Sequence, residues 1–180
     1  SSAASDVYKR QVSGYGTGGT FSGVSRVLKE QSPKTKLVIT EPDNAQLVNS
    51  LIAQKRNQDG SPASGHDSWN PHPIQGWTPD FIPLVLQESI DKNYFDMNIP
   101  VSGEDGIYWS HKLARNEGVI TGISGGSTFA VAMKIAEEAA DGANILCMLA
   151  DTAERYLSSV LFEKIDSEMN DEEKEILSSI

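Results

Sequence analysis

Three short apolar runs constrain the fold of this chain more than any other feature of its sequence. They occupy residues 36–40 (KLVIT), 119–123 (VITGI) and 144–149 (NILCML), and their apolar residues are nearly continuous rather than alternating. Such runs are typical of parallel strands that are buried on both faces. Stretches with helical periodicity separate them, so the sequence predicts an α/β fold, a mostly parallel sheet with helices on both faces.

Five segments have the pattern of helices. Two of them have clear end signals: Ser102 begins a capping-box pattern that Gly118 closes, and Asn170 or Asp171 caps a short acidic helix. The acidic run of that last helix is expected to be a solvated first turn, which the helix dipole favours. The sequence predicts helices over 20–31, 44–56, 102–116, 127–140 and 170–178.

The charge balance bears on the partners of the chain. There are 15 Lys and Arg against 25 Asp and Glu, and the net charge of -10 argues against nucleic acid or an anionic membrane as the main partner. No apolar run approaches the roughly 20 residues that cross a bilayer. The single cysteine, Cys147, cannot form an internal disulfide and is expected to be a buried core thiol. We therefore expect a reducing compartment, cytoplasmic or organellar.

A glycine-rich turn opens the first predicted helix. Glycines allow positive φ and a close approach of the backbone to a ligand. Successive amide groups then point at one spot, where the positive end of a helix favours an anion. The pattern predicts a phosphate cradle, or else only a tight strand-to-helix turn, formed by Gly14, Gly16, Thr17, Gly18, Gly19 and Thr20.

The glycine pattern has two functional interpretations. Residues 14–19 match the dinucleotide fingerprint GxGxxG, and Glu41 after the next strand stands where a ribose-binding acid would be. Two further polar turns, 121–128 around Ser124 and 149–159, also follow predicted strands. Because the carboxyl ends of strands in an open α/β sheet meet in one crevice, all three turns are expected to line one site. A serine at the start of a helix can also be no more than a cap.

A long segment without periodicity, 57–79, interrupts the α/β pattern. A structureless segment of this length inside a compact domain is usually functional or disordered. Its second half carries Trp69, His72, Ile74 and Trp77, which is too apolar for a linker. The sequence therefore predicts an ordered loop at the active site, with His72 either a rigid turn residue or a ligand contact.

Five blocks of sequence follow one another along the chain: GTGGTFSGVSRVLKE, ITEP, HPIQGWTPDFIP, GISGGSTFA and LADTAERYLSS. In this order they resemble the cysteine synthase (O-acetylserine sulfhydrylase) family of fold type II pyridoxal 5'-phosphate (PLP) enzymes. The resemblance covers about residues 12–165. It implies PLP as the cofactor and the larger domain of a tryptophan synthase β-like fold, present here in part.

The resemblance also implies a role for each block. Ser124 matches the serine that hydrogen-bonds the pyridine nitrogen, and a hydroxyl there suits loss of a β-leaving group. Asp151 and Thr152 match residues behind the pyridine ring. The segment near the substrate entrance corresponds to Gln75, Gly76 and Trp77. The loop that binds the cofactor phosphate corresponds to Gly16, Thr17, Gly18, Gly19 and Thr20.

The sequence departs from the family pattern in three places. Ala150 and Ala153 stand where the family has Pro and Gly in its last block. The Schiff-base lysine of the family, and the loop that binds the substrate carboxylate, lie in an N-terminal region without a counterpart here, and none of the ten lysines has the expected setting. Since PLP catalysis starts from that lysine, we expect no catalytic residue in this chain, and no metal site.

The expected organisation has three parts. Residues 1–11 (SSAASDVYKRQ) are polar where a buried strand should lead into the glycine loop, so we expect a leader that is not native. Residues 12–165 are expected to form the PLP-binding α/β portion. Residues 166–180 are expected to form an acidic C-terminal helix.

The resemblance implies the C-terminal portion of a cysteine synthase. The whole enzyme would convert O-acetyl-L-serine and sulfide into L-cysteine and acetate by PLP-dependent β-elimination and replacement, and this chain alone would be inactive. As a full-length protein it would be a homodimer and could bind the C-terminal peptide of serine acetyltransferase. Three alternatives stay open: a non-catalytic phosphate- or peptide-binding module, a cystathionine β-synthase-like enzyme, and an NAD-binding oxidoreductase.

Overall fold

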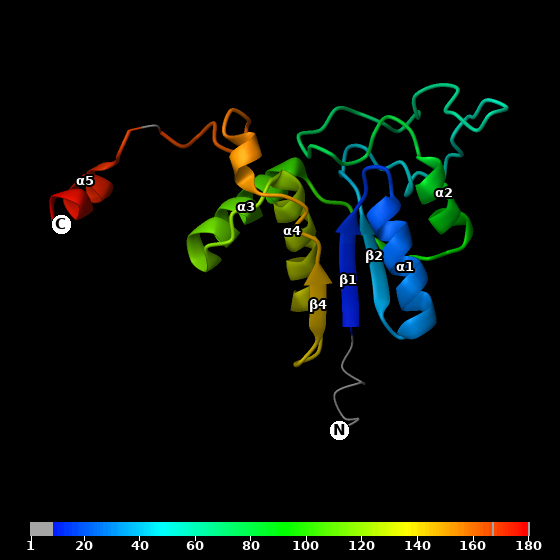
Figure 1. The fold of residues 1–180 in the computed structure, drawn as a ribbon, viewed down its shortest axis with the longest axis horizontal. Coiled ribbons are helices and arrows are strands. Elements are labelled where there is room, and N and C mark those ends of the chain that lie inside the picture. Colours follow the sequence, from blue (N-terminus) through cyan, green and yellow to red (C-terminus); the bar gives the residue numbers. More distant parts are fainter. Residues whose placement is uncertain (1–8, 167, 180) are drawn as a thin grey trace.

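The computed structural model describes residues 9–166 and 168–179 (Figure 1). Its strands form one sheet in the order β3-β2-β1-β4, and all neighbouring strands are parallel. The strands are β1 (Lys9–Gly14), β2 (Lys36–Thr40), β3 (Met97–Asn98) and β4 (Asn144–Cys147), and the helices are α1 (Gly19–Gln31), α2 (Leu84–Asp91), α3 (Gly103–Glu117), α4 (Ile123–Glu137), the 3-10 helix η2 (Ala153–Tyr156) and α5 (Asp171–Ser178). The predicted parallel α/β sheet is confirmed.

β1 is one of the two inner strands of the sheet, because it pairs with β2 on one side and β4 on the other. The strand begins at Lys9, so residues 9–11, which were expected in the leader, are part of the sheet. Lys9 is tolerated because it is exposed at the start of the strand, and the buried Gln11 donates its side-chain amide to the Val12 carbonyl oxygen at 3.3 Å. Residues 1–8 of the expected leader lie outside the described residues, and their origin stays a prediction.

The two faces of the sheet carry separate hydrophobic clusters, because side chains along a strand alternate between the faces. Val38 of β2 belongs to one cluster, together with Ile123 of α4. Its neighbours Leu37 and Ile39 belong to the other cluster, together with Phe21 of α1. Figure 1 shows α1 and α2 to one side of β1 and α3 and α4 to the other. The predicted helices on both faces are therefore confirmed.

α3 and α4 pack closely through small residues. A Cβ atom at Gly126 of α4 would lie only 2.0 Å from the carbonyl oxygen of Gly106 in α3 and 2.2 Å from Ser110 Oγ. No side chain larger than hydrogen fits at that position without separating the helices. This contact matters for the site, because α4 carries Ser124 in its first turn.

The ends of α3 follow the sequence signals. The Ser102 hydroxyl accepts a hydrogen bond from the backbone N–H of Asp105 at 3.0 Å, and Gly118, with φ 67°, ends the helix. α4 begins at Ile123 rather than at residue 127 as predicted. α2 and β3 were not predicted from the sequence.

Two predicted elements are wrong. Residues 44–56 form turns and an extended stretch instead of a helix, because the backbone N–H groups of Val48 and Asn49 donate to the carboxylate of Glu41. Residues 119–123 form no strand of the sheet. They connect α3 to α4, and because these two helices pack against each other, the short connection stays beside the helices and does not pair with the sheet. An isolated bridge joins Thr121 to Thr152.

The C-terminal part follows the predictions more closely. β4 covers residues 144–147 of the predicted run, but as an edge strand it is not buried on both faces, and Leu146 is 67% exposed. Cys147, expected to be buried, is half-buried against the core, where burial raises the pKa of its thiol. Asn170 caps α5 in a capping box with Glu173. None of the helices in the described ranges is long and apolar enough to cross a membrane.

Candidate functional site

The glycine loop joins the carboxyl end of β1 to the start of α1. Gly18 is the N-cap of α1, with φ 85°, and no side chain among the described residues provides a capping hydrogen bond there. The backbone N–H of Gly19 donates to Thr17 Oγ1 at 3.4 Å, a long and weak contact. The positive end of a 13-residue helix therefore faces the loop with amide groups that can donate to an anion.

Two positions in this loop require glycine. Gly18 has the left-handed backbone conformation, and a Cβ there would also lie 2.7 Å from the Cβ of Leu86. At Gly16 a Cβ would lie 2.4 Å from the carbonyl oxygen of Gly76. The loop is thus pressed between α2 and the segment around Gly76, and its shape depends on the missing side chains.

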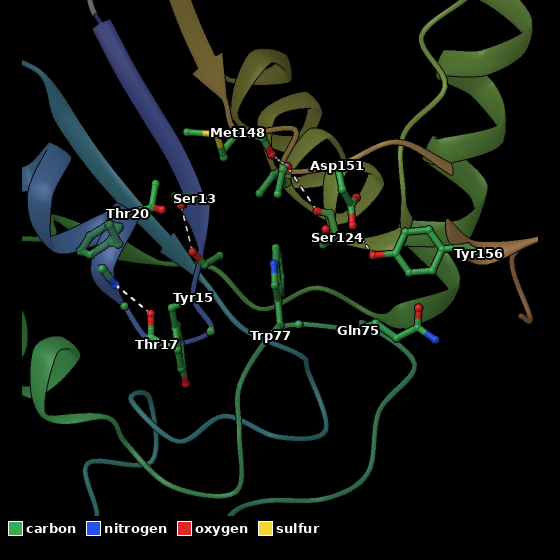
Figure 2. Close-up of a pocket in the computed structure, with 18 residues that line it drawn as sticks. Ser13, Tyr15, Thr17, Thr20, Gln75, Trp77, Ser124, Met148, Asp151 and Tyr156 are labelled. Carbon is green, nitrogen blue, oxygen red and sulfur yellow. Dashed lines mark hydrogen bonds between the residues drawn. The ribbon is translucent and has the colours of Figure 1, made fainter. Parts of the chain in front are cut away.

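The opposite wall comes from the start of α4 and the residues that follow β4. Ser124 is buried in the first turn of α4. One turn later the Thr128 hydroxyl donates to the Met148 carbonyl oxygen at 2.5 Å, and this ties α4 to the chain as it leaves β4. In Figure 2, Ser124, Met148 and Asp151 lie on one side of the cavity, and Thr17 and Thr20 lie on the other.

Asp151 and Tyr156 form a hydrogen-bonded pair at the edge of this wall. The Tyr156 hydroxyl donates to the Asp151 carboxylate, and burial together with this contact raises the pKa of Tyr156 to about 12. Both side chains lie against Gly122, the N-cap of α4: a Cβ there would be 2.3 Å from Tyr156 Cε2 and 2.5 Å from Asp151 Oδ1. The carboxylate thus lies at the N-terminal end of α4.

The third wall is the end of the long loop that the sequence placed at the active site. Gln75, Gly76 and Trp77 reach the cavity, and the backbone N–H of Thr78 donates to the Tyr15 carbonyl oxygen at 2.8 Å. The loop is therefore ordered and hydrogen-bonded to the glycine turn. His72 does not line the cavity; its Nε2 lies 3.2 Å from the Thr78 carbonyl oxygen, so it has a structural contact in the loop.

These walls enclose a cavity of about 200 Å³ at the carboxyl ends of β1 and β4. In open α/β sheets, ligands bind in this crevice outside the carboxyl ends of the strands. The predicted phosphate loop, the predicted substrate segment and the predicted ring-nitrogen contact all line it: Gly16, Thr17, Gly18, Gly19, Thr20, Gln75, Gly76, Trp77 and Ser124. Asp151 lines it as well, whereas Thr152 does not.

Sequence reasoning gave no individual role to several lining residues: Ser13, Tyr15 and Met148, and also Thr128 and Tyr156, which lie in the turns 121–128 and 149–159 expected at the site. Three of them had a usable signal. Ser13 and Tyr15 flank the first glycine of the loop, and Met148 directly follows β4, so all three stand where strands end. Thr128 had a weaker signal, because it lies one helical turn after Ser124 on the same face.

Glu41 has no place in the cavity. It is fully buried, and both of its oxygens accept hydrogen bonds: Oε2 from the Tyr15 hydroxyl at 2.7 Å and Oε1 from the side-chain amide of Asn98 at 2.8 Å. With the backbone N–H groups of Val48 and Asn49 also donating, the carboxylate is fully occupied inside the protein. It cannot be the ribose-binding acid that the dinucleotide interpretation requires.

The buried hydroxyl of Tyr15 predicts a loss of stability in alkali. Burial, reinforced by the charge of Glu41, raises the pKa of Tyr15 well above its usual value near 10. The folded chain therefore keeps a proton that the unfolded chain loses, so this contribution is complete below pH 10 and declines as the pH rises further. From pH 9 to 11 we expect a loss of about 1.4 kcal/mol from this group.

The measurement is urea unfolding of the wild type and the Tyr15→Phe variant at both pH values. The variant should start lower, because it lacks the bond to Glu41, but its stability should fall less between pH 9 and 11. Lysines that titrate in the same range affect both proteins equally. An identical fall in both proteins would show that Tyr15 does not hold its proton in the folded chain.

The cavity fits a phosphorylated planar ligand such as PLP. The glycine loop offers amide donors and the end of a helix dipole for a phosphate, and a Cβ at Gly16 or Gly18 would fill this cradle. Across the cavity, the hydroxyl of Ser124 can hydrogen-bond a ring nitrogen. Asp151 Oδ1 on the same wall is buried without a hydrogen-bond partner among the described residues, so it can accept a hydrogen bond from a donor group of the ligand.

Comparisons with known proteins agree with this geometry. The family model described as pyridoxal-phosphate dependent enzyme matches residues 5–151. O-ureido-L-serine synthase from Streptomyces lavendulae is 38% identical over 160 residues, which are 89% of this chain and 43% of that protein. Cysteine synthase B from Campylobacter jejuni is 40% identical over 151 residues, which are 84% of this chain and 43% of that protein.

A solved structure shows the same fold. The crystal structure of O-ureido-L-serine synthase superimposes with a TM-score of 0.76 at 37% identity, over 92% of this chain and 46% of that one. The chain thus spans less than half the length of the relatives that it matches. Its glycine loop, its serine at the start of α4 and the extent of the family match together decide the assignment. This chain belongs to the pyridoxal-phosphate dependent enzyme family.

Proposed function

We propose that the chain carries the cofactor-binding part of a cysteine synthase, an enzyme that converts O-acetyl-L-serine and sulfide into L-cysteine and acetate. One observation carries the proposal: the phosphate cradle and Ser124, which come from segments far apart in the sequence, line one cavity. The similarity to cysteine synthase B supports the choice of reaction.

A second candidate has specific support. O-ureido-L-serine synthase is similar to this chain both in sequence and in structure, and its name gives a different product. In this alternative the same cofactor site would serve an enzyme that joins another group to the serine carbon skeleton. Assays of the whole protein with sulfide and with hydroxyurea as the second substrate would separate the two.

The roles of the residues follow from their positions. The amide groups at the start of α1 and the hydroxyls of Thr17 and Thr20 bind the phosphate. The hydroxyl of Ser124 orients the ring by its nitrogen. When bound, the cofactor supplies an electron sink for loss of a β-leaving group. The loop at Trp77 forms one side of the cavity.

The chain provides no lysine to the cavity: none is among the lining residues in the described ranges. Since the family needs a lysine to bind the cofactor covalently, we propose that this chain alone does not turn over. Supplied with PLP, O-acetyl-L-serine and sulfide, it should form no L-cysteine beyond the protein-free reaction. Clear turnover would show that one of its ten lysines fills the role. We further propose that the whole protein acts in the cytoplasm or an organelle, as a homodimer able to bind the serine acetyltransferase peptide.

Binding of pyridoxine 5'-phosphate tests the cofactor site directly. This analogue lacks the aldehyde of PLP, so it cannot react with surface lysines. Titration calorimetry should give clear binding of pyridoxine 5'-phosphate and much weaker binding of pyridoxine. Only the phosphorylated compound can bind the amide donors and the positive end of α1 in the cradle. Equal binding of the two compounds would contradict the phosphate cradle.

The Ser124→Ala variant tests the other end of the site. Loss of one hydrogen bond of about 1 kcal/mol should raise the Kd of pyridoxine 5'-phosphate roughly fivefold. Ser178→Ala is the matched control, because Ser178 lies on the exposed α5 and does not line the cavity. If both variants bind as the wild type does, Ser124 does not contact the ring nitrogen.

A further inference from the structure

The indole of Trp77 lies directly against the backbone of Gly14, at the end of β1. A Cβ at Gly14 would lie 2.0 Å from Trp77 Cε2 and 2.1 Å from Cζ2, so the ring occupies the space that any other residue would fill. Figure 2 shows the indole standing in the cavity between Ser124 on one side and the glycine loop with Thr17 and Thr20 on the other. The ring is thus a wall between the two ends of the site.

The backbone that carries this ring is firmly held. Thr78, the next residue, donates its N–H to the Tyr15 carbonyl oxygen at 2.8 Å, and its own carbonyl oxygen accepts from Trp69 Nε1 at 3.0 Å. His72 Nε2 lies 3.2 Å from the same oxygen. These contacts fix Thr78 in a left-handed conformation, with φ 37°.

Such a conformation is unfavourable for a threonine and persists only where the surroundings impose it. Gly76, on the other side of Trp77, is left-handed as well, with φ 79°. The two left-handed residues turn the side chain between them into the cavity. The backbone of Thr78 is therefore strained, and this strained conformation holds the indole of Trp77 in a fixed position.

We propose that Trp77 is a specificity-determining residue, whose indole stacks on the planar ring of a ligand held by its phosphate in the glycine loop. The inference rests on the proposed function and adds a selection that neither the phosphate cradle nor Ser124 can make. The cradle holds any phosphate of the right charge. A flat aromatic wall between the cradle and Ser124 favours a phosphate that carries a planar ring over one that does not.

The test compares two ligands that share the cradle. Pyridoxine 5'-phosphate carries a planar ring, and inorganic phosphate carries none. In the wild type, pyridoxine 5'-phosphate should bind more tightly. Trp77→Ala should raise its Kd about tenfold, the effect typical of a lost stacking contact, and should leave the Kd of inorganic phosphate unchanged.

Trp77→Phe keeps a smaller aromatic wall and guards against a misfolded variant. It should retain most of the preference for the ring, and circular dichroism should match the wild type. Trp109→Phe is the control for a tryptophan outside the cavity, where the ring packs edge-on against Phe129. Quenching of tryptophan fluorescence by pyridoxine 5'-phosphate should disappear in Trp77→Phe and persist in Trp109→Phe.

The outcomes separate this inference from the proposed function. If Trp77→Ala weakens both ligands equally, the indole only shapes the loop, and the inference is overturned. It is also overturned if Trp77→Ala binds pyridoxine 5'-phosphate as the wild type does. If the wild type binds neither ligand, the proposed cofactor site itself fails. A selective loss for the ring ligand, with phosphate binding intact, supports both.

Discussion

Replacing Gly126 with alanine is expected to lower the free energy of unfolding by about 3 kcal/mol, the upper range for an overpacked core position. The new Cβ would lie 2.0 Å from the Gly106 carbonyl oxygen, 2.2 Å from Ser110 Oγ and 2.7 Å from the Ser110 backbone nitrogen. Two of these atoms belong to the backbone of α3 and cannot rotate away. α3 and α4 must therefore move apart, which loosens the packing between them.

Gly23→Ala provides the matched control. Gly23 is also a helical glycine, in α1, but a Cβ there meets nothing within 4 Å. Because glycine lowers the stability of a helix interior, this change should raise stability by roughly 0.5–1 kcal/mol. Urea unfolding followed by circular dichroism measures both variants. If both variants were more stable than the wild type, the close packing of α3 on α4 would not be what requires glycine at position 126.

The same substitution should reach the cofactor site. Ser124 lies two residues before Gly126 in α4, so a helix displaced from α3 carries the hydroxyl with it. In conditions where Gly126→Ala is still folded, we expect weaker binding of pyridoxine 5'-phosphate than in Gly23→Ala. The position of the site thus depends on a glycine that never contacts the ligand.

Local signals explain which parts of the fold were predictable. β2 is a continuous apolar run whose ends match the prediction, and α3 has a cap at Ser102 and a stop at Gly118 within its own sequence. Each of these features is decided by residues next to one another in the chain. The same holds for the glycine loop, where closely spaced glycines in the sequence already indicate that its backbone approaches other groups closely.

The wrong predictions share a different cause. Residues 44–56 contain helix-forming residues, but the carboxylate of Glu41 captures the N–H groups of Val48 and Asn49. A buried acceptor from another segment thus overrides local propensity. Residues 119–123 are apolar enough for a strand, yet the packing of α3 on α4 leaves them as a connection. Neither effect can be found in a window of neighbouring residues.

The candidate site divides in the same way. The glycine loop and Ser124 were predicted, because each stands in a motif of consecutive residues at the end of an apolar run or the start of a helix. Tyr156 belongs to the turn 149–159 that was expected at the site, but its own contact with the cavity was not predicted, since it depends on the path of η2 after β4. The position of Trp77 against Gly14 was also not predictable, because it joins two segments more than sixty residues apart.

Replacing Glu41 with alanine is expected to cost about 4 kcal/mol of stability, as when one partner of a buried charged network is removed. The variant leaves four donors without their acceptor inside the protein: the Tyr15 hydroxyl, the side-chain amide of Asn98, and the backbone N–H groups of Val48 and Asn49. Glu30→Ala, on the exposed end of α1, is the control and should change stability by less than about 0.5 kcal/mol.

A double-mutant cycle shows whether the carboxylate or simple packing holds this region together. In the wild type, Tyr15→Phe should cost about 1 kcal/mol, because it removes one hydrogen bond to Glu41. In the Glu41→Ala background the acceptor is already gone, so the same change should cost nothing or even stabilise, since it removes an unpaired buried hydroxyl. Additive costs would mean that Tyr15 is held by its aromatic ring alone. Non-additive costs would instead show that the hydrogen bond to Glu41 holds Tyr15 in place. Since Tyr15 lines the cofactor cavity, Glu41 would then position a wall of the site without contacting the ligand.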